Sequence, residues 1–160
     1  MNINGLNNNE SNHRTEPNHQ PHWLSEFVSV YQHLSTDNLA LIDSIYDPEI
    51  HFVDPMHELH GRTQLLNYFE GLYQNLNYCR FIIDNVIQQE DEAAIYWEMT
   101  YQHKTLNKGK MVTVRGSSHL RAENGKIIYH RDYLDLGAML YEQLPLVGQF
   151  ISWIKNKASK

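Results

Sequence analysis

The residues with the most evident chemistry stand close together near the end of the chain. His130, Arg131, Asp132, Tyr133 and Asp135 fall within six positions. An imidazole beside a carboxylate forms an acid-base pair in which the carboxylate is the base, or in which it holds the imidazole in one tautomer and makes that group the base. Either arrangement can remove a proton next to a carbonyl group, the step that aldol-type cyclisation and double-bond isomerisation share.

A β-hairpin is predicted to carry these residues. Asn124 and Gly125 are flanked by β-rich runs, and both residue types adopt positive φ at low cost, as a two-residue hairpin turn requires. The sequence therefore predicts two long strands within residues 111–134 that are joined at this turn.

Strand alternation sorts the side chains of the second strand onto two faces. His130 and Asp132 share one face, whereas Arg131 and Tyr133 share the other. Two interpretations are open for Asp132: it is a base that faces a cavity, or it pairs with an arginine of the hairpin and fixes the sheet. The same two interpretations, functional and structural, apply to His130.

Helices are predicted to precede the strands. Apolar residues recur at helical spacing in three segments, and β-rich runs follow them. The predicted helices cover residues 21–34, 39–45 and 65–72, and the predicted strands before the hairpin cover residues 50–53, 78–88 and 93–103. Helices first and antiparallel strands afterwards indicate an α+β fold with the helices on one face of a curved sheet.

Composition and charge exclude several classes. The net charge of −6 argues against a nucleic-acid-binding protein. Cys79 is the single cysteine, so an intramolecular disulfide is excluded. No apolar run is long enough to span a membrane, and the N-terminus lacks the pattern of a signal peptide. We therefore expect a cytoplasmic protein.

The two ends of the chain differ from its middle. Residues 1–20 are polar and Asn-rich, which predicts a disordered tail. Residues 21–157 are expected to form one domain that includes a C-terminal helical segment. Pro145 is expected to interrupt that segment, and the amphipathic piece at 146–157 either lies on a membrane surface or packs on the sheet or on a partner subunit.

The order of these elements resembles a known family. The pieces YDPEIHFVDPMHELHG, AIYWEMTY and NGKIIYHRDYLD are similar to the SnoaL-like branch of the nuclear-transport-factor-2-like superfamily, over about residues 23–141. The resemblance implies a curved antiparallel sheet that forms a cone, N-terminal helices packed on its concave face, and an apolar cavity between them. It also implies a homodimer that forms through the outer face of the sheet.

The resemblance further implies that Asp132 and His130 face the cavity as the catalytic pair. Trp97 and Met99 share a face of their strand and suit the wall of an apolar pocket, although core packing explains them equally well. Gly116 is expected to leave space where the sheet bends.

A second polar cluster lies between Asp54 and His60. Turn formation is the favoured role of Asp54, followed by a pocket role that His57 would share. The third interpretation is a metal site with Asp54, His57, Glu58 and His60 as the possible ligands. Tyr46 completes the predicted pocket residues. We predict no metal and no cofactor, because no zinc motif or phosphate-binding loop is present.

The sequence thus predicts a protein that binds a hydrophobic, carbonyl-bearing small molecule, with chemistry like that of a polyketide cyclase, isomerase or lyase. The alternative is a non-catalytic ligand-binding or protein-interaction module. An enclosed cavity into which Asp132 or His130 points favours the first, whereas a cavity filled by Trp97, Met99 and other side chains argues against it.

Overall fold

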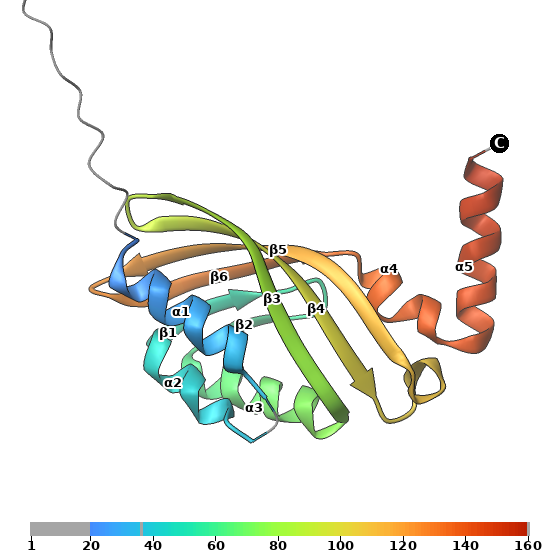
Figure 1. Ribbon diagram of the computed structural model, residues 1–160, viewed down its shortest axis with the longest axis horizontal. Coiled ribbons are helices and arrows are strands. Elements are labelled where there is room, and N and C mark those ends of the chain that lie inside the picture. Colours follow the sequence, from blue (N-terminus) through green and yellow to red (C-terminus); the bar gives the residue numbers. More distant parts are fainter. Residues whose placement is uncertain (1–19, 36, 160) are drawn as a thin grey trace, which may run out of the picture.

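The computed structural model describes residues 20–35 and 37–159. The predicted polar tail, residues 1–20, therefore lies outside the described residues except for Gln20. Six strands form one sheet with the order β2-β1-β6-β5-β4-β3, and the sheet curves around one side of the molecule (Figure 1). The strands are β1 (Tyr46–Val53), β2 (Glu58–His60), β3 (Leu76–Gln89), β4 (Glu92–His103), β5 (Met111–Glu123) and β6 (Lys126–Leu134).

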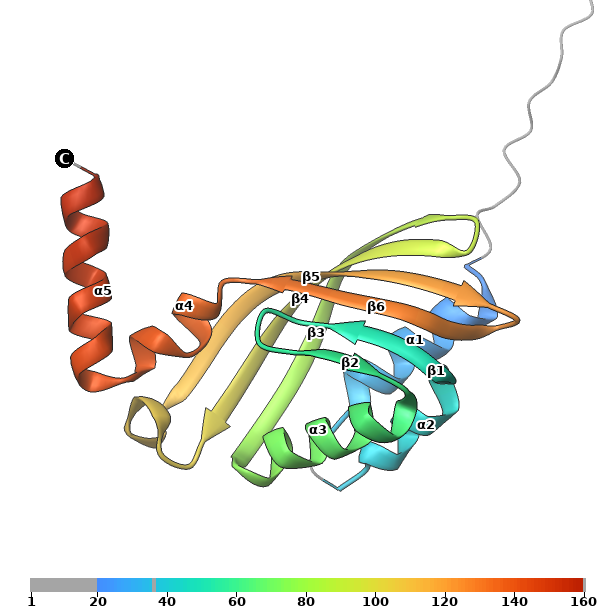
Figure 2. The same ribbon diagram turned by 180° about the vertical axis from the view of Figure 1, so that it is seen from behind.

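Three N-terminal helices cover the concave side of this sheet (Figures 1 and 2). They are α1 (His22–His33), α2 (Ile42–Ile45), which follows the short helix η1 (Leu39–Leu41), and α3 (Arg62–Gln74). The other helices in the described part of the chain are η2 (Leu106–Gly109), α4 (Leu136–Met139), η3 (Tyr141–Gln143) and α5 (Pro145–Ala158). The predicted α+β cone is confirmed.

The predicted hairpin is also confirmed. β5 and β6 are joined by Asn124 and Gly125, whose φ angles are 51° and 77°. A register shift between Arg121 and Ala122 then displaces the pairing by one residue, so that Ser118 lies opposite Asp132. This shift decides which side chains meet across the hairpin.

The sheet differs from the prediction in two places. It is not antiparallel throughout, because β1 runs parallel to β6 and pairs Phe52 with His130. A short turn between two strands makes them antiparallel. No turn links β1 and β6, so these two strands can run parallel. The predicted loop at 54–60 contains β2, which begins at Glu58 after a turn closed by the bond from Asp54 N to His57 O at 2.9 Å.

Pro145 separates the two helical pieces of the C-terminal segment, as predicted, and it is itself the first residue of the second piece. It occupies the first turn of α5, where the missing N–H of proline costs no intrahelical hydrogen bond. Helix α5 stands apart from the cone at the end of the chain, beyond α4 (Figures 1 and 2).

The core lies between the helices and the concave face of the sheet. Its fully buried aliphatic and aromatic members come from α1, α2, α3 and all the strands except β2 and β3, and they include Leu24, Phe27, Ile42, Ile50, Phe52, Leu65, Ile95, Leu120 and Ile127. This packing fixes the concave face of β6, and hence the position of His130.

Gly116 provides the space that one core aromatic ring needs. It lies opposite Trp97, and the register between β4 and β5 is unbroken at this pair. A Cβ atom at Gly116 would lie 2.4 Å from Trp97 Cη2 and 2.8 Å from the carbonyl oxygen of Tyr133. Close contacts of this kind force side chains and backbone to shift.

We therefore expect Gly116→Ala to lower the free energy of unfolding by about 1–3 kcal/mol, as measured by urea denaturation. Gly71 in α3 is the matched control, because a Cβ atom there meets no atom within 4 Å. Gly71→Ala should raise stability by about 0.5–1 kcal/mol through helix propensity. Equal effects of the two substitutions would contradict the assigned role of Gly116.

Candidate active site

A cavity of about 250 Å³ lies between the helices and the concave face of the sheet. Most of its wall is aromatic or aliphatic, and it includes Phe52, Phe69, Phe81, Met99 and Leu134. The polar and ionisable side chains on the wall are Tyr31, Asp54, Tyr68, Tyr73, Asn75, Cys79, Trp97, Tyr101, His103 and Asp132. The cavity is therefore an apolar chamber with a few polar groups at fixed positions.

Asp132 on β6 is held by two neighbouring side chains. Its Oδ1 accepts a hydrogen bond from Ser118 Oγ at 2.5 Å and lies 2.8 Å from His130 Nε2. The Asp132 side chain is 18% exposed, whereas that of His130 is 1% exposed. Both contacts reach the same oxygen, so the orientation of the carboxylate is fixed from one side.

His130 connects Asp132 to two buried tyrosines. Its Nδ1 lies 2.6 Å from the Tyr46 hydroxyl, which in turn lies 2.7 Å from the Tyr31 hydroxyl. Tyr31 borders the cavity, but His130 and Tyr46 lie behind its wall. The ring of Phe52 packs edge-on against the His130 imidazole, with 5.0 Å between the ring centroids. An apolar side chain therefore covers one side of the hydrogen-bonded groups.

The hydrogen bonds that link Tyr31, Tyr46, His130 and Asp132 all run from donor to acceptor in the same direction. An ionised Asp132 can only accept, so His130 carries its proton on Nε2 when the imidazole is neutral. Nδ1 then accepts from the Tyr46 hydroxyl, whose oxygen accepts from Tyr31. Each group donates to the next, and the series ends at Asp132.

Ser118 extends the same network across the sheet, from β6 to β5 and β4. Its hydroxyl donates to Asp132 and accepts from Trp97 Nε1 at 2.8 Å. The six side chains therefore form one continuous series in the order Tyr31, Tyr46, His130, Asp132, Ser118 and Trp97.

The two tyrosines of this series are neutral donors. Burial raises the pKa of Tyr31 far above its usual value, and the negative charge of Asp132 adds to the shift. Burial likewise raises the pKa of Tyr46. Desolvation disfavours a phenolate in both places, so these hydroxyls keep their protons at neutral pH.

A second polar pair lies on the cavity wall. The Tyr68 hydroxyl donates a short hydrogen bond to Asp54 Oδ2, and burial raises the pKa of Tyr68. Asp54 Oδ1 accepts from the backbone N–H groups of Met56 and His57, both at 2.7 Å. Asp54 therefore forms the turn before β2 and also borders the cavity.

The predicted site residues fall into three groups. Four of them border the cavity: Asp132, Trp97, Met99 and Asp54. Two stand behind its wall in the hydrogen-bonded series: His130 and Tyr46. Two lie elsewhere: Gly116, which accommodates the Trp97 ring, and His57, whose side chain is 49% exposed.

Sequence reasoning missed Tyr31, Ser118 and Tyr68. Tyr31 lies on the predicted first helix, but the sequence does not indicate which residue the hydroxyl group of a core tyrosine will bond to. Ser118 shares a strand face with Gly116, and its contact with Asp132 depends on the register shift in the hairpin. Tyr68 adjoins the apolar stripe of α3 and reaches Asp54 only through tertiary packing.

A group of potential metal ligands lies outside the cavity, where β1 pairs with β2. The ligand atoms of His51, Glu58 and His60 all lie within 4.8 Å of one another, and the imidazole rings stack with centroids 4.4 Å apart. Asp54 and His57, which the sequence places in the same loop, are not part of this group.

Cys79 borders the cavity, and burial raises the pKa of its thiol to about 11. The thiolate is the reactive form, so at pH 8 its population is about a hundredfold smaller than for an exposed cysteine. We expect iodoacetamide to alkylate the folded protein correspondingly slowly, with a rate that rises up to about pH 11. Mass spectrometry of the modified chain measures this rate, and alkylation as fast as that of free cysteine at pH 8 would contradict the assignment.

Solved structures resemble this chain in fold. A candidate SnoaL-like polyketide cyclase from Jannaschia sp. CCS1 superimposes with a TM-score of 0.66 at 14% identity, over 74% of this chain and 88% of that chain. A protein with a ketosteroid isomerase-like fold from Catenulispora acidiphila DSM 44928, in complex with trimethylamine, gives 0.64 at 16% identity, over 77% and 92%. TerC, co-crystallised with polyporic acid, gives 0.64 at 15% identity, over 73% and 94%.

These identities establish the fold and leave the activity open. No curated protein matches the chain significantly. The family model of the SnoaL-like domain matches residues 27–130, which is more than half of the chain and extends from the middle of α1 to the middle of β6. The chain therefore belongs to the SnoaL-like domain family.

Proposed function

We propose that this protein binds a hydrophobic, carbonyl-bearing small molecule in its cavity and catalyses proton transfer on it, as an isomerase or a cyclase does. One observation carries this proposal: the wall of a mostly apolar cavity presents Asp132, and buried donors hold one oxygen of its carboxylate. A carboxylate fixed beside apolar surface is suited to accept a proton from carbon.

The base would be the second oxygen of Asp132. Ser118 and His130 both bond to Oδ1, and no hydrogen bond among the described residues reaches Oδ2. Oδ2 is thus the atom that can meet a ligand. His130 is a positioning residue in this scheme, because it lies behind the wall and acts through Asp132.

The reaction balances with this single base. Oδ2 takes a proton from the carbon next to a carbonyl group, and the electron pair of the broken C–H bond becomes an enolate. In isomerisation Asp132 returns the proton to another carbon of the conjugated system. In cyclisation the enolate carbon attacks a second carbonyl group of the same molecule, and the proton goes to the alkoxide that forms.

The size and lining of the cavity support a compact ligand. Its volume of about 250 Å³ is close to the lower end of the range for small-molecule sites, roughly 300–1,000 Å³. The rings of Tyr31, Phe81 and Trp97 on its wall favour a flat, aromatic or conjugated molecule. The names of two similar structures, a candidate polyketide cyclase and a protein co-crystallised with polyporic acid, agree with such a ligand.

The test has two steps. The protein is incubated with a panel of flat carbonyl compounds, and native mass spectrometry identifies those that stay bound. Each bound compound is then incubated with the protein in D₂O, where we expect deuterium to enter the carbon next to the carbonyl group. Failure of every compound to bind would overturn ligand binding, and binding without exchange would overturn catalysis.

The second candidate function is ligand binding without catalysis. The predominance of apolar groups on the cavity wall favours this function, because such a wall suits the storage or transport of an apolar ligand as well as its catalytic conversion. In that case ligands bind, deuterium exchange stays at the uncatalysed rate, and Asp132→Asn changes neither quantity.

We also propose that residues 21–157 act as one domain in the cytoplasm, as a homodimer formed through the outer face of the sheet. Three large side chains on that face are exposed by 43–50%: Ile82, Tyr96 and Tyr133. Multi-angle light scattering measures the mass, and Tyr96→Lys with Tyr133→Lys is expected to convert a dimer into monomers because like charges would meet at the interface.

A further inference from the structure

Helix α5 exposes an unusually apolar face. Its large hydrophobic residues recur at helical spacing, and the fractional exposure of three of them is 82% for Leu146, 60% for Phe150 and 55% for Trp153. Val147 and Ile154 extend the same face and are exposed by 41% and 45%. A continuous patch of this kind on a single helix marks an interaction surface.

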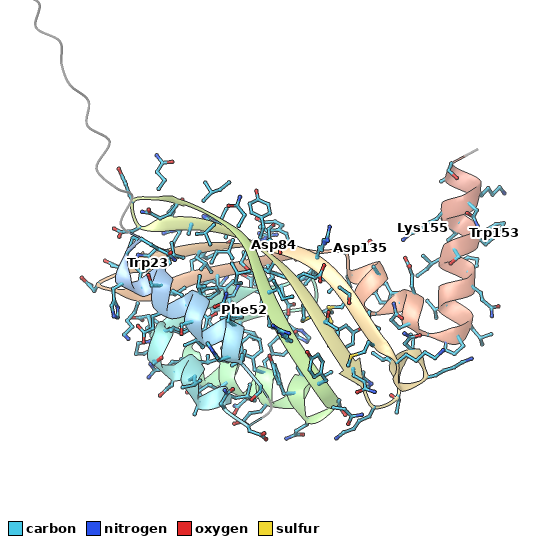
Figure 3. The ribbon with its side chains drawn as sticks, in the orientation of Figure 1. Trp23, Phe52, Asp84, Asp135, Trp153 and Lys155 are labelled. Carbon is cyan, nitrogen blue, oxygen red and sulfur yellow. The ribbon has the colours of Figure 1, made fainter. Side chains whose placement is uncertain are left out.

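The opposite side of α5 is the side that contacts the rest of the chain. Gly148 is buried there, and a Cβ atom on it would lie 2.4 Å from the carbonyl oxygen of Glu142. Lys155 forms an ion pair with the Glu142 side chain. Figure 3 shows Lys155 on the side of α5 that faces the body of the molecule, and Trp153 on the other side. The apolar face therefore points away from the cone.

From this face we infer that α5 binds the surface of a phospholipid membrane and lies in its interfacial plane. An amphipathic helix binds there with its apolar face in the acyl boundary and its polar face in water. The helix has 14 residues, about 21 Å at 1.5 Å per residue. No helix among the described residues is long and apolar enough to cross a membrane.

The charge of α5 suits an anionic lipid surface. Residues 145–158 contain no acidic side chain, although the whole chain has a net charge of −6. Lys157 Nζ lies 5.0 Å from the centre of the Trp153 ring. A tryptophan beside a lysine is suited to the headgroup region, where the ring is partly buried and the ammonium group meets phosphate.

The shape of the face points to the same partner. It is the convex side of one helix that stands apart from the cone (Figures 1 and 2). A bilayer accepts a convex apolar helix directly, whereas a protein partner must supply a groove of matching shape. This inference rests on α5 and does not depend on the function proposed for the cavity.

The test uses the full chain with vesicles made from equal parts of phosphatidylglycerol and phosphatidylcholine. We expect the protein to sediment with the vesicles. Tryptophan emission should shift to the blue on binding, and Trp153 is the reporter, because Trp23 and Trp97 are each only 5% exposed in the free protein.

Two double variants separate the faces of the helix. Leu146→Ser with Phe150→Ser is expected to lower the vesicle-bound fraction about tenfold or more, without a change in melting temperature, because both side chains are exposed. Gln149→Ser with Asn156→Ser alters exposed residues outside the apolar face and should leave binding unchanged.

Two results would overturn the inference. One is a wild-type protein that stays in the supernatant with an unshifted emission spectrum. The other is a dimer, seen by light scattering without vesicles, that the Leu146 and Phe150 variant converts into monomers, because the apolar face would then bind a second copy. A dimer that persists in this variant is compatible with the inference, since it forms elsewhere.

Discussion

Asp132→Asn is expected to slow deuterium exchange into a bound carbonyl compound by about 10²–10⁴-fold, the usual contribution of a general base. Asparagine has the same shape, and its amide oxygen still accepts from Ser118 and His130. The amide group cannot take up the proton, however, so the base is lost while the geometry is kept. The affinity for the ligand should change by only a few-fold, because the aromatic and aliphatic wall is unaltered.

Deuterium incorporation, followed by mass spectrometry, measures this effect at a saturating ligand concentration. Asp84→Asn is the matched control, because Asp84 is an exposed carboxylate of β3. That variant should exchange at the wild-type rate. An unchanged rate in Asp132→Asn would exclude Asp132 as the base.

His130→Leu is expected to lower the free energy of unfolding by about 2–5 kcal/mol. The substitution preserves much of the side-chain volume but removes both ring nitrogens from the buried network. The Tyr46 hydroxyl, which is fully buried, loses its acceptor, and Asp132 loses one of its two donors. Buried polar groups without partners pay a desolvation cost that no new contact offsets.

Urea denaturation followed by circular dichroism measures this loss. His119→Leu on β5 is the control, since that side chain is 40% exposed and its contact with Glu92 is a surface pair. We expect a change within about 0.5 kcal/mol for the control. A similarly small change in His130→Leu would show that the buried series contributes little to stability.

Tyr46→Phe distinguishes stability from proton transfer within the same series. It removes one hydroxyl and leaves the contact between His130 and Asp132 intact. We expect a loss of about 1–3 kcal/mol, because His130 Nδ1 and Tyr31 each lose a buried partner. The rate of deuterium exchange should fall less than in Asp132→Asn. An equal fall in this rate would show that Tyr46 is required for the proton transfer itself.

Local sequence signals predicted much of the fold. Asn124 and Gly125 satisfied the positive φ of the turn, and alternation along β6 placed His130 and Asp132 on the inner face. Both signals depend on interactions within a few residues, which a single sequence records directly. The predicted break before the last helix is confirmed, and α5 begins at Pro145, one residue earlier than predicted, because proline suits the first turn of a helix.

The register of the hairpin was beyond such local reasoning. Counting outward from the turn pairs Asp132 with Ser117, whose side chain lies on the face of Tyr133. The shift between Arg121 and Ala122 changes this partner to Ser118. Bulges depend on how the sheet twists and packs, so their positions are decided by contacts across the whole molecule.

The sequence by itself determined that an imidazole and a carboxylate share one face of a strand, because alternation is a property of the extended backbone. Only the tertiary structure decided what they touch. Tyr46 is 84 positions from His130 along the chain, and Tyr31 comes from a separate helix. Such contacts depend on how α1 and β1 pack on the sheet, and packing at this range leaves no periodic signal in a single sequence. The tertiary structure therefore joins the predicted pair to a buried network and leaves Asp132 at the wall of the cavity.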